Sequence, residues 1–425
     1  MGSTILEKIL GRASGSATVS PGEIIIVDID CTILLDVSFH FIQHGLGGRE
    51  ILRVADPKKI AVIFDHGVPA PDASTAAMHI AGREFVKRFG IEHFHDVGYD
   101  HGISHVVVAD KAYALPGSVL LGGDSHTCSA GAFNCAARAV SSPDILHAMT
   151  TGKTWFRVSE TVRYDLEGTL RPGVSMKDVF LHIAGTFGHH VNQCLEFGGP
   201  GIAALSINAR RTLTTMCAEL SADFAIFEAD QRLLDYVHQR NAAPFTPVQP
   251  DPNAHYEDRR TLHLDRIEPL VGLPDAVVNN SAPVTQVAGT PIHQAFVGSC
   301  ANGTLDDLKI AANAVAGKRI PAGVRFIVTP GSQEIWRQAM AEGYVQKLVE
   351  AGAVVTNATC GACFGGHMGV LGPGETCITA STRNFKGRMG HPSARIYMAS
   401  PATVAASALA GRIALPDAFT NGGAS

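Results

Sequence analysis

The sequence predicts an α/β protein in which mostly parallel sheets are flanked by helices. Short, largely apolar runs recur along the chain, and each is bounded by Gly, Pro or charged residues. Such runs are typical of parallel strands that are buried on both faces. Helical patterns separate them, and this alternation indicates α/β domains. The chain of 425 residues is too long for one ordinary core, so we expect two or three domains.

The first part of the chain contains a predicted amphipathic helix, three buried strands and a long helix. The helix at 1–10 lacks the basic start and the apolar stretch of a signal peptide. The strands are predicted at 23–27, 59–64 and 118–121, and the second helix at 75–89.

The last part of the chain repeats this pattern of strands and helices. A Thr N-cap at Thr304 and Gly317 delimit one predicted helix. A second runs from Ser332 to about Ala351, and Pro401 lies in the first turn of a third that ends near Gly411. The predicted strands are 293–297, 324–328, 354–356 and 376–380.

Two domain boundaries are predicted where strand-like runs meet segments of irregular pattern. One falls near 160–170, where the strand-like run 163–166 leads into a stretch containing Gly and Pro, and the other near 280–290. The residues at 241–256 are rich in Pro, Asn and Asp and are predicted to form an exposed loop. The predicted α/β domains are 1–165, 166–287 and 288–425.

Composition excludes several classes of function. The net charge of -5 provides no electrostatic footprint for nucleic acid. No apolar run reaches the roughly 18 residues that a membrane span needs. Nine cysteines, an odd number in a long chain without an export signal, favour a reducing, cytoplasmic location.

Three cysteines carry most of the chemical information. Cys300 lies in Gly-Ser-Cys, and Cys360 and Cys363 form a C-x-x-C motif. An iron–sulfur cube held by protein at every corner takes four thiolates, so three leave one iron open to act as a Lewis acid. From the residues alone, zinc binding or dithiol redox chemistry at the C-x-x-C motif stays open. We interpret the other cysteines as core residues or bystanders: Cys31, Cys128, Cys135, Cys194, Cys217 and Cys377.

Polar clusters that suit acid–base chemistry follow apolar runs or lie in Gly-containing turns. The carboxyl ends of parallel strands line the crevice where α/β folds bind ligands. An Asp beside a His orients the imidazole and raises its basicity, and Arg holds carboxylates with a planar fork. A lone Asp-His pair is more often structural, and His189-His190 is interpreted as a solvated turn. The clusters are Asp65-His66, His101 with His105, Asp124-Ser125-His126, and Arg383 with Arg388.

Together these motifs resemble the aconitase superfamily. More narrowly, the chain is similar to the large subunits of two-chain hydro-lyases of the 3-isopropylmalate dehydratase type, from about residue 20 to 415. The most specific stretches are Gly123-Asp124-Ser125-His126-Thr127, Gly298-Ser299-Cys300, Cys360-Gly361-Ala362-Cys363 and Arg383-Asn384-Phe385-Lys386-Gly387-Arg388.

The resemblance implies a three-domain core without the swivelling domain of single-chain aconitases. It assigns a [4Fe-4S] cluster with one open iron to Cys300, Cys360 and Cys363. The implied catalytic residues are Asp65, His66, His105, Asp124, Ser125, His126 and Glu219, and the implied substrate-binding residues are Arg383, Arg388 and Asn302.

The implied reaction is reversible removal of water from a small hydroxy di- or tricarboxylic acid. His66 would protonate the leaving hydroxyl, and a separate small subunit would complete the site with the base. The first expected substrate is 3-isopropylmalate, with 2-methylmalate, 2,3-dimethylmalate and homoaconitate as alternatives. The chain departs from the family pattern at Thr215, Ala301 and Thr382, in the early segment 33–40 and in the run 134–138. These departures put the usual substrates in question. A non-catalytic, iron-sensing RNA binder is a further alternative that the acidic charge disfavours.

Overall fold

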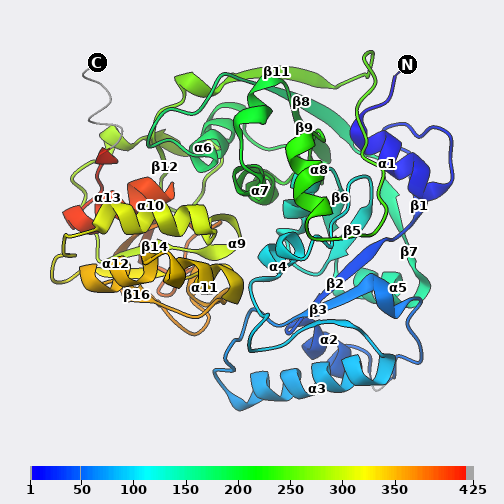
Figure 1. Cartoon of the computed structure of the whole chain (residues 1–425), viewed down its shortest axis with the longest axis horizontal. Coiled ribbons are helices and arrows are strands. Elements are labelled where there is room, and N and C mark those ends of the chain that lie inside the picture. Colours follow the sequence, from blue (N-terminus) through cyan, green and yellow to red (C-terminus); the bar gives the residue numbers. More distant parts are fainter. Residues whose placement is uncertain (1, 48, 418–425) are drawn as a thin grey trace.

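The computed structural model describes residues 2–47 and 49–417 and contains three larger sheets flanked by helices (Figure 1). The first sheet has five strands, all parallel, in the order β4-β3-β2-β5-β6. Their bounds are β2 Cys31–Leu35, β3 Ile60–Ile63, β4 His93–His95, β5 Val119–Gly122 and β6 Ala136–Ala139.

The second sheet has four parallel strands in the order β10-β9-β8-β11. They are β8 Glu160–Glu167, β9 Gln193–Gly198, β10 Phe224–Phe227 and β11 Asp258–His263. The third sheet has seven strands in the order β13-β12-β18-β17-β14-β15-β16 and is parallel except for β12 and β13. They are β12 Leu270–Gly272, β13 Ser281–Pro283, β14 Gln294–Val297, β15 Arg325–Val328, β16 Val354–Val355, β17 Thr376–Thr379 and β18 Arg395–Ala399.

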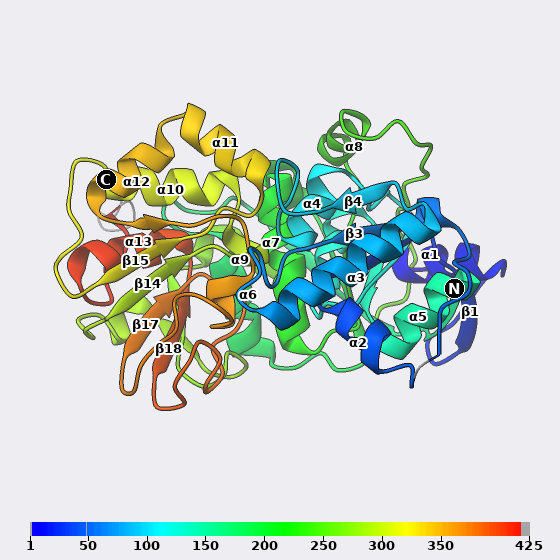
Figure 2. The ribbon, with the colours of Figure 1, turned by 90° about the horizontal axis from the view of Figure 1, so that it is seen from below.

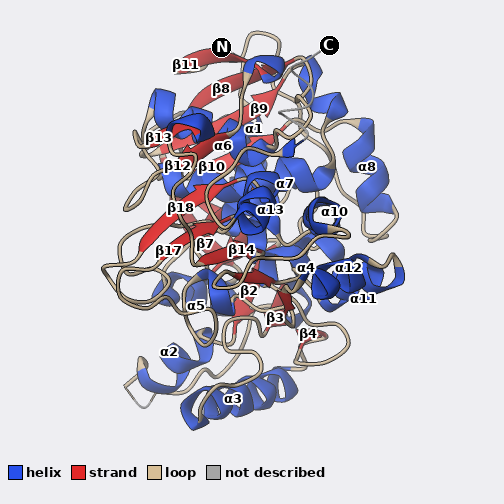
Figure 3. Ribbon diagram, turned by 90° about the vertical axis from the view of Figure 1, so that its left-hand side faces the viewer, coloured by secondary structure: helices blue, strands red, loops and turns tan. Residues whose placement is uncertain are grey.

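Helices cover the faces of these sheets (Figure 3). The α-helices are α1 Ile5–Ser14, α2 Ser38–His44, α3 Ala73–Phe89, α4 Ser104–Asp110, α5 Ser142–Thr151, α6 Met176–Phe187, α7 Ile207–Met216, α8 Gln231–His238, α9 Ser299–Asn302, α10 Leu305–Val315, α11 Gln333–Ala341, α12 Tyr344–Ala351 and α13 Pro401–Ala410. The 3₁₀ helices are η1 Pro57–Lys59, η2 Thr127–Phe133, η3 Pro200–Ala204, η4 Cys217–Leu220, η5 Leu264–Arg266, η6 Val284–Gln286 and η7 Gly361–Cys363. In the described part of the chain, no helix is long and apolar enough to cross a membrane.

The predicted α/β class with mostly parallel sheets is confirmed, but the first predicted strand is wrong in its environment. β1 (Ile24–Asp28) is not a buried parallel strand; it pairs antiparallel with β7 (Lys153–Arg157) in a two-stranded ribbon. Ile24 is 72% exposed and Ile26 65%. The apolar run was therefore no proof of burial on both faces, because the run carries no information about what covers it.

One helix prediction is also wrong. The helix predicted from Ser332 to about Ala351 is two helices, α11 and α12, with Gly343 between them at φ 73°, a conformation that favours glycine. β12 and β13 lie before residue 288 but pair within the third sheet. The division into three domains stays a prediction.

The connections after the parallel strands bring distant segments together in the middle of the molecule. In Figures 1 and 2, α4, α7 and α9 lie between the first and third sheets. The residues that follow β3, β5, β14 and β17 include Asp65, Asp124, Cys300 and Arg383. This arrangement agrees with the rule that the carboxyl ends of parallel strands form the ligand-binding edge.

Candidate functional site

The turn after β3 presents an imidazole that two carboxylates hold. His66 Nδ1 lies 2.6 Å from Asp65 Oδ1. Because a carboxylate only accepts, this ring nitrogen carries the hydrogen and Nε2 is left to face the site. Burial opposes the charge on the ring, but Asp65 and then Asp124 outweigh it and raise the pKa of His66 to about 10. The ring is therefore an imidazolium at neutral pH and can donate a proton.

Asp36 is a buried residue of this turn whose role the sequence did not predict. Its Oδ1 accepts from the backbone N–H of His66 at 3.3 Å, and its Oδ2 accepts from that of Gly67 at 2.8 Å. Burial works against its charge, but His79 and His66 lower the pKa of Asp36 below its ordinary value. Asp36 directly follows an apolar strand, so the strand-end rule that pointed to Asp65 would also have found it.

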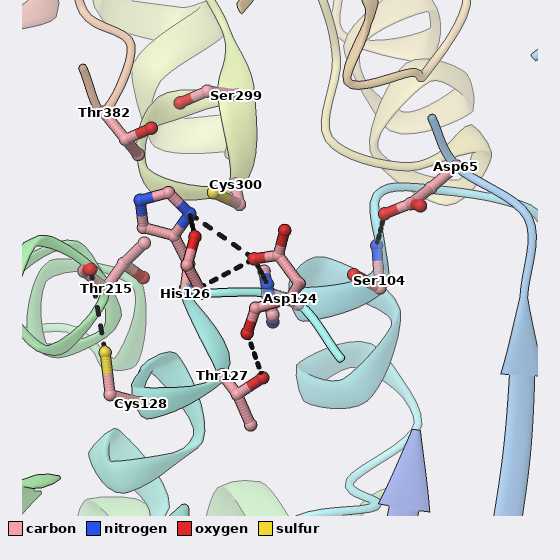
Figure 4. A network of polar contacts seen from close by, with 12 residues as sticks. Asp65, Ser104, Asp124, His126, Thr127, Cys128, Thr215, Ser299, Cys300 and Thr382 are labelled. Atoms are coloured by element: carbon pink, nitrogen blue, oxygen red, sulfur yellow. Dashed lines mark hydrogen bonds and ion pairs between the residues drawn. The ribbon is translucent and has the colours of Figure 1, made fainter. Parts of the chain in front are cut away.

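The loop after β5 and helix α4 bring two more imidazoles, those of His126 and His105, to the carboxylate of Asp124. Figure 4 shows Asp124 beside His126. Asp124 Oδ1 accepts from His105 Nε2 at 2.7 Å and from the backbone N–H of His126 at 2.8 Å. Its other oxygen lies 3.8 Å from His66 Nε2. Burial disfavours the carboxylate charge, but hydrogen bonds from both imidazoles hold the pKa of Asp124 well below its ordinary value. Asp124 therefore links all three imidazoles.

The network continues from His126 to the predicted arginine. His126 Nε2 lies 3.0 Å from Glu219 Oε1, and Arg383 Nε donates to the same oxygen at 2.7 Å. Burial opposes protonation of His126, but Asp124 and Glu219 raise its pKa to about 9. Despite burial, His126 and Arg383 lower the pKa of Glu219. Charges of opposite sign thus alternate from Asp65 to Arg383.

Two nearby residues named in the predicted polar clusters, Ser125 and His101, do not belong to this chain of ion pairs. Ser125 is exposed, and its Oγ reaches only to 3.5 Å from His126 Nδ1. His101 is buried and bonds the backbone carbonyls of Gly98 and Ala358 at 3.0 and 2.9 Å. His101 therefore has a structural role in positioning the loop before Cys360.

The prediction of a solvated turn at 189–190 is wrong for His190, whose Nε2 is buried against the Tyr164 hydroxyl at 2.8 Å.

The C-x-x-C segment is joined directly to the Asp-His turn. The backbone N–H of Cys360 donates to the carbonyl of Asp65 at 2.9 Å, and the hydroxyl of Thr359 donates to the same carbonyl at 3.0 Å. These bonds connect residues almost 300 positions apart in the sequence. The thiols of the third sheet and the imidazole of the first are therefore parts of one site.

Cys300 lies at the other side of the site on the short helix α9. Arg211 Nη2 donates to its carbonyl at 3.3 Å, and Thr212 Oγ1 donates to that of Ala301 at 2.9 Å. Ser299 adopts φ 84°, a strained conformation for a residue with a side chain. Figure 4 shows the His126 ring pointing toward Cys300 and Thr382.

Positive groups lie close to two of the three thiols, those of Cys363 and Cys300. Arg388 Nε donates to the Cys363 carbonyl at 3.2 Å, and its Nη2 lies 3.8 Å from Cys363 Sγ. Cys360 and, against burial, Arg388 lower the pKa of Cys363 well below its ordinary value. Lys177, fully buried on α6, donates to the Ser381 carbonyl at 3.0 Å. Lys177 was also missed, although its apolar helical neighbours were a usable signal of burial.

Comparison with known proteins assigns the family. The family model described as "Aconitase family (aconitate hydratase)" matches residues 52–282 and 273–411. The 3-isopropylmalate dehydratase large subunit of Mycolicibacterium smegmatis is 50% identical over 97% of this chain and 96% of its own length. The chain belongs to the aconitase family. Large subunits of the same name from Methanopyrus kandleri (numbered 1) and Aquifex aeolicus are each 42% identical over 98% of this chain, covering 99% and 98% of their own lengths.

As an aconitase-family hydro-lyase, this chain has a donor set that suits the iron–sulfur cluster implied by the family. Burial raises the pKa of Cys300 well above its ordinary value, and Lys177 and Arg211 partly offset this effect. A buried thiol of this kind is deprotonated by coordination. Asn302 has a buried Oδ1 without a hydrogen-bond partner, while its Nδ2 donates to Asp307 at 3.2 Å. The residues present therefore fit a cluster ligated by three thiolates.

The family departures lie close to this site but have local partners. The Thr215 hydroxyl donates to the Arg211 carbonyl at 2.6 Å within α7. Thr382 Oγ1 lies 3.7 Å from Cys363 Sγ. The six cysteines interpreted as core residues or bystanders are all buried.

Proposed function

We propose that this chain is the large subunit of a 3-isopropylmalate dehydratase, a cytoplasmic hydro-lyase of leucine biosynthesis. The observation that carries the proposal is the 50% identity to the Mycolicibacterium smegmatis large subunit over 97% of this chain. The reaction would move a hydroxyl group by reversible dehydration and rehydration of a substituted malate.

Cys300, Cys360 and Cys363 would hold a [4Fe-4S] cluster. The chemistry that such a cluster supplies when bound is the Lewis acidity of one iron without a protein thiolate, which polarises the carbon–oxygen bond that breaks. Lys177, Arg211 and Arg388 offset the thiolate charge, and the proximity of each to a cluster cysteine supports this assignment.

His66 would protonate the departing hydroxyl as a general acid. The hydrogen bond from its Nδ1–H to Asp65 fixes the orientation of the ring, and its pKa of about 10 keeps Nε2 protonated at neutral pH. After the transfer, the neutral ring would regain a proton when water adds in the reverse direction, because Asp65 and Asp124 favour the imidazolium.

The other polar residues would hold the substrate and stabilise charge. Asp124 orients His105 and His126, and Glu219 fixes Arg383 through Nε, leaving the guanidinium Nη atoms for a substrate carboxylate. Arg388 would hold a second carboxylate, and Asn302 would contribute its unpartnered Oδ1 as an acceptor. Ser125, being exposed, would act only once the site is covered.

A separate small subunit would cover the site and supply the base that removes the carbon-bound proton. This part of the proposal is supported by the relatives, which are named large subunits. A second chain also accounts for the exposure of Ser125 and for the 19% exposure of the His66 side chain.

The test is co-expression with a small subunit, anaerobic reconstitution and a panel of substituted malates and homoaconitate. The expected result is iron–sulfur absorption in the visible range and turnover of 3-isopropylmalate. A fully loaded pair that hydrates or dehydrates 2-methylmalate or 2,3-dimethylmalate instead would reassign the substrate. Bound zinc without sulfide would overturn the proposal altogether.

A further inference from the structure

One aromatic ring, that of Phe364, lies close to both groups that would hold the ends of the substrate. The Phe364 centroid is 5.8 Å from that of the His66 imidazole, with the planes at 49°. The guanidinium carbon of Arg388 lies 5.7 Å from the same Phe364 centroid. Phe364 therefore contacts both the proposed proton donor and a proposed carboxylate clamp, and it is only partly buried.

Gly366 determines where this ring lies. A Cβ atom built on Gly366 would be 2.2 Å from Cζ and 2.3 Å from Cε2 of Phe364. The backbone of Gly366 does not have a positive φ, and its N–H donates to the Gly361 carbonyl at 3.0 Å. The backbone conformation at this position does not require glycine. The position of the Phe364 ring does, because any side chain on residue 366 would push the phenyl group away.

We propose that Phe364 selects the substrate by its alkyl group, an inference that rests on the proposed function. A malate bound with its hydroxyl at His66 and a carboxylate at Arg388 places its carbon substituent against the phenyl ring. An isopropyl group buries apolar surface there, which stabilises the bound state in proportion to the area removed from water. A third carboxylate would meet the ring without a hydrogen-bond partner and be disfavoured. Phe364 therefore favours 3-alkylmalates over tricarboxylic acids.

The test compares two substrates in one preparation of the reconstituted two-subunit enzyme. The measured quantity is kcat/KM for 3-isopropylmalate divided by kcat/KM for 3-methylmalate, a ratio from which differences in cluster loading cancel. Phe364→Ala should lower this ratio about tenfold, the order expected for losing the contacts of the two extra carbons. Phe364→Leu, which restores an apolar side chain, should recover most of the ratio.

Two matched controls separate this role from general disturbance. Phe385 also lies over Arg388, with the guanidinium carbon 5.6 Å from its centroid, but it is 47% exposed; Phe385→Ala should leave the ratio unchanged. Gly366→Ala should lower the ratio as Phe364→Ala does. Gly372→Ala should not, because a Cβ on Gly372 would meet no heavy atom closer than 3.7 Å.

A binding measurement keeps the test independent of turnover. Isopropylsuccinate and methylsuccinate lack the hydroxyl, and the ratio of their inhibition constants should shift in the same direction in Phe364→Ala. Unchanged ratios in both Phe364→Ala and Gly366→Ala would overturn this inference while leaving the proposed function intact. If the wild-type pair neither turns over nor binds any substituted malate or succinate, the proposed function itself fails.

Discussion

The imidazole–carboxylate half of the site and the cysteine half are stabilised in different ways. In the first half, hydrogen bonds of 2.6 and 3.0 Å join Asp65 to His66 and His126 to Glu219. Asp124 accepts from the backbone N–H of His126 at 2.8 Å and lies 3.8 Å from His66 Nε2. In the second half, Cys363 Sγ lies 3.7 Å from Thr382 Oγ1 and 3.8 Å from Arg388 Nη2, and the buried Oδ1 of Asn302 has no hydrogen-bond partner. The imidazoles and carboxylates are therefore held by charged partners within the chain, whereas the thiols have weaker contacts of this kind.

The largest expected effect is on the cysteine half. Replacing any one of the three cysteines, as in Cys300→Ser, Cys360→Ser or Cys363→Ser, should abolish the full cluster, because three thiolates are its complete set of protein ligands. Iron and sulfide content and visible absorption measure this loss. Cys377→Ala is the matched control, a buried cysteine of β17 that should leave the cluster intact. A full cluster in any of the three serine variants would refute the ligand assignment.

The next largest effect is expected in the imidazole–carboxylate half, from a change that leaves the cysteine half intact. His66→Ala should retain the cluster and lose turnover by about 10²- to 10⁴-fold, the usual contribution of a general acid. The measurement is kcat together with iron content, and His189→Ala, at an exposed histidine, should change neither. Turnover at the wild-type rate would remove His66 from the mechanism.

A smaller effect is expected at the carboxylate behind His66. Asp36→Asn keeps the shape of the side chain but replaces an ionic acceptor of two backbone N–H groups. We expect a loss of about 1–3 kcal/mol in the free energy of unfolding and a reduced kcat, without loss of cluster. Urea unfolding and steady-state rates measure both effects. Asp56→Asn, at an exposed helix cap, should leave kcat unaltered, and an unperturbed kcat in Asp36→Asn would contradict a positioning role.

The smallest effect is a dependence of stability on pH. The pKa of His126 is raised from 6.5 to about 9, so its protonation stabilises the folded state fully below pH 6.5 and progressively less up to about pH 9. The melting-temperature advantage of the cluster-free wild type over His126→Gln should therefore shrink as pH rises through this interval. His189→Gln should show no such trend, and an advantage for the wild type independent of pH would contradict the ion pairs with Asp124 and Glu219.

Sequence patterns located the polar groups and thiols that meet at the site better than they predicted the surroundings of the strands and helices. The C-x-x-C motif and the Asp-His pairs were visible because each depends on neighbours within a few residues. Asp36 and Lys177 stand outside any multi-residue motif, and their only signals were the strand end before Asp36 and the apolar helical neighbours of Lys177. β1 was misjudged for a related reason: an apolar strand has the same sequence whether a helix covers it or solvent does.

The identities of the reactive groups follow from local sequence, since the turn that presents Cys360 and Cys363 and the strand end that presents Asp65 and His66 are each short-range features. Their assembly into one site does not. Packing of the sheets creates the bond from Cys360 N–H to the Asp65 carbonyl. It also brings His126 and Arg383 to one oxygen of Glu219. The nearness of Phe364 to both His66 and Arg388 has the same origin. Packing sets these distances because side chains separated by tens to hundreds of residues meet only in the folded core.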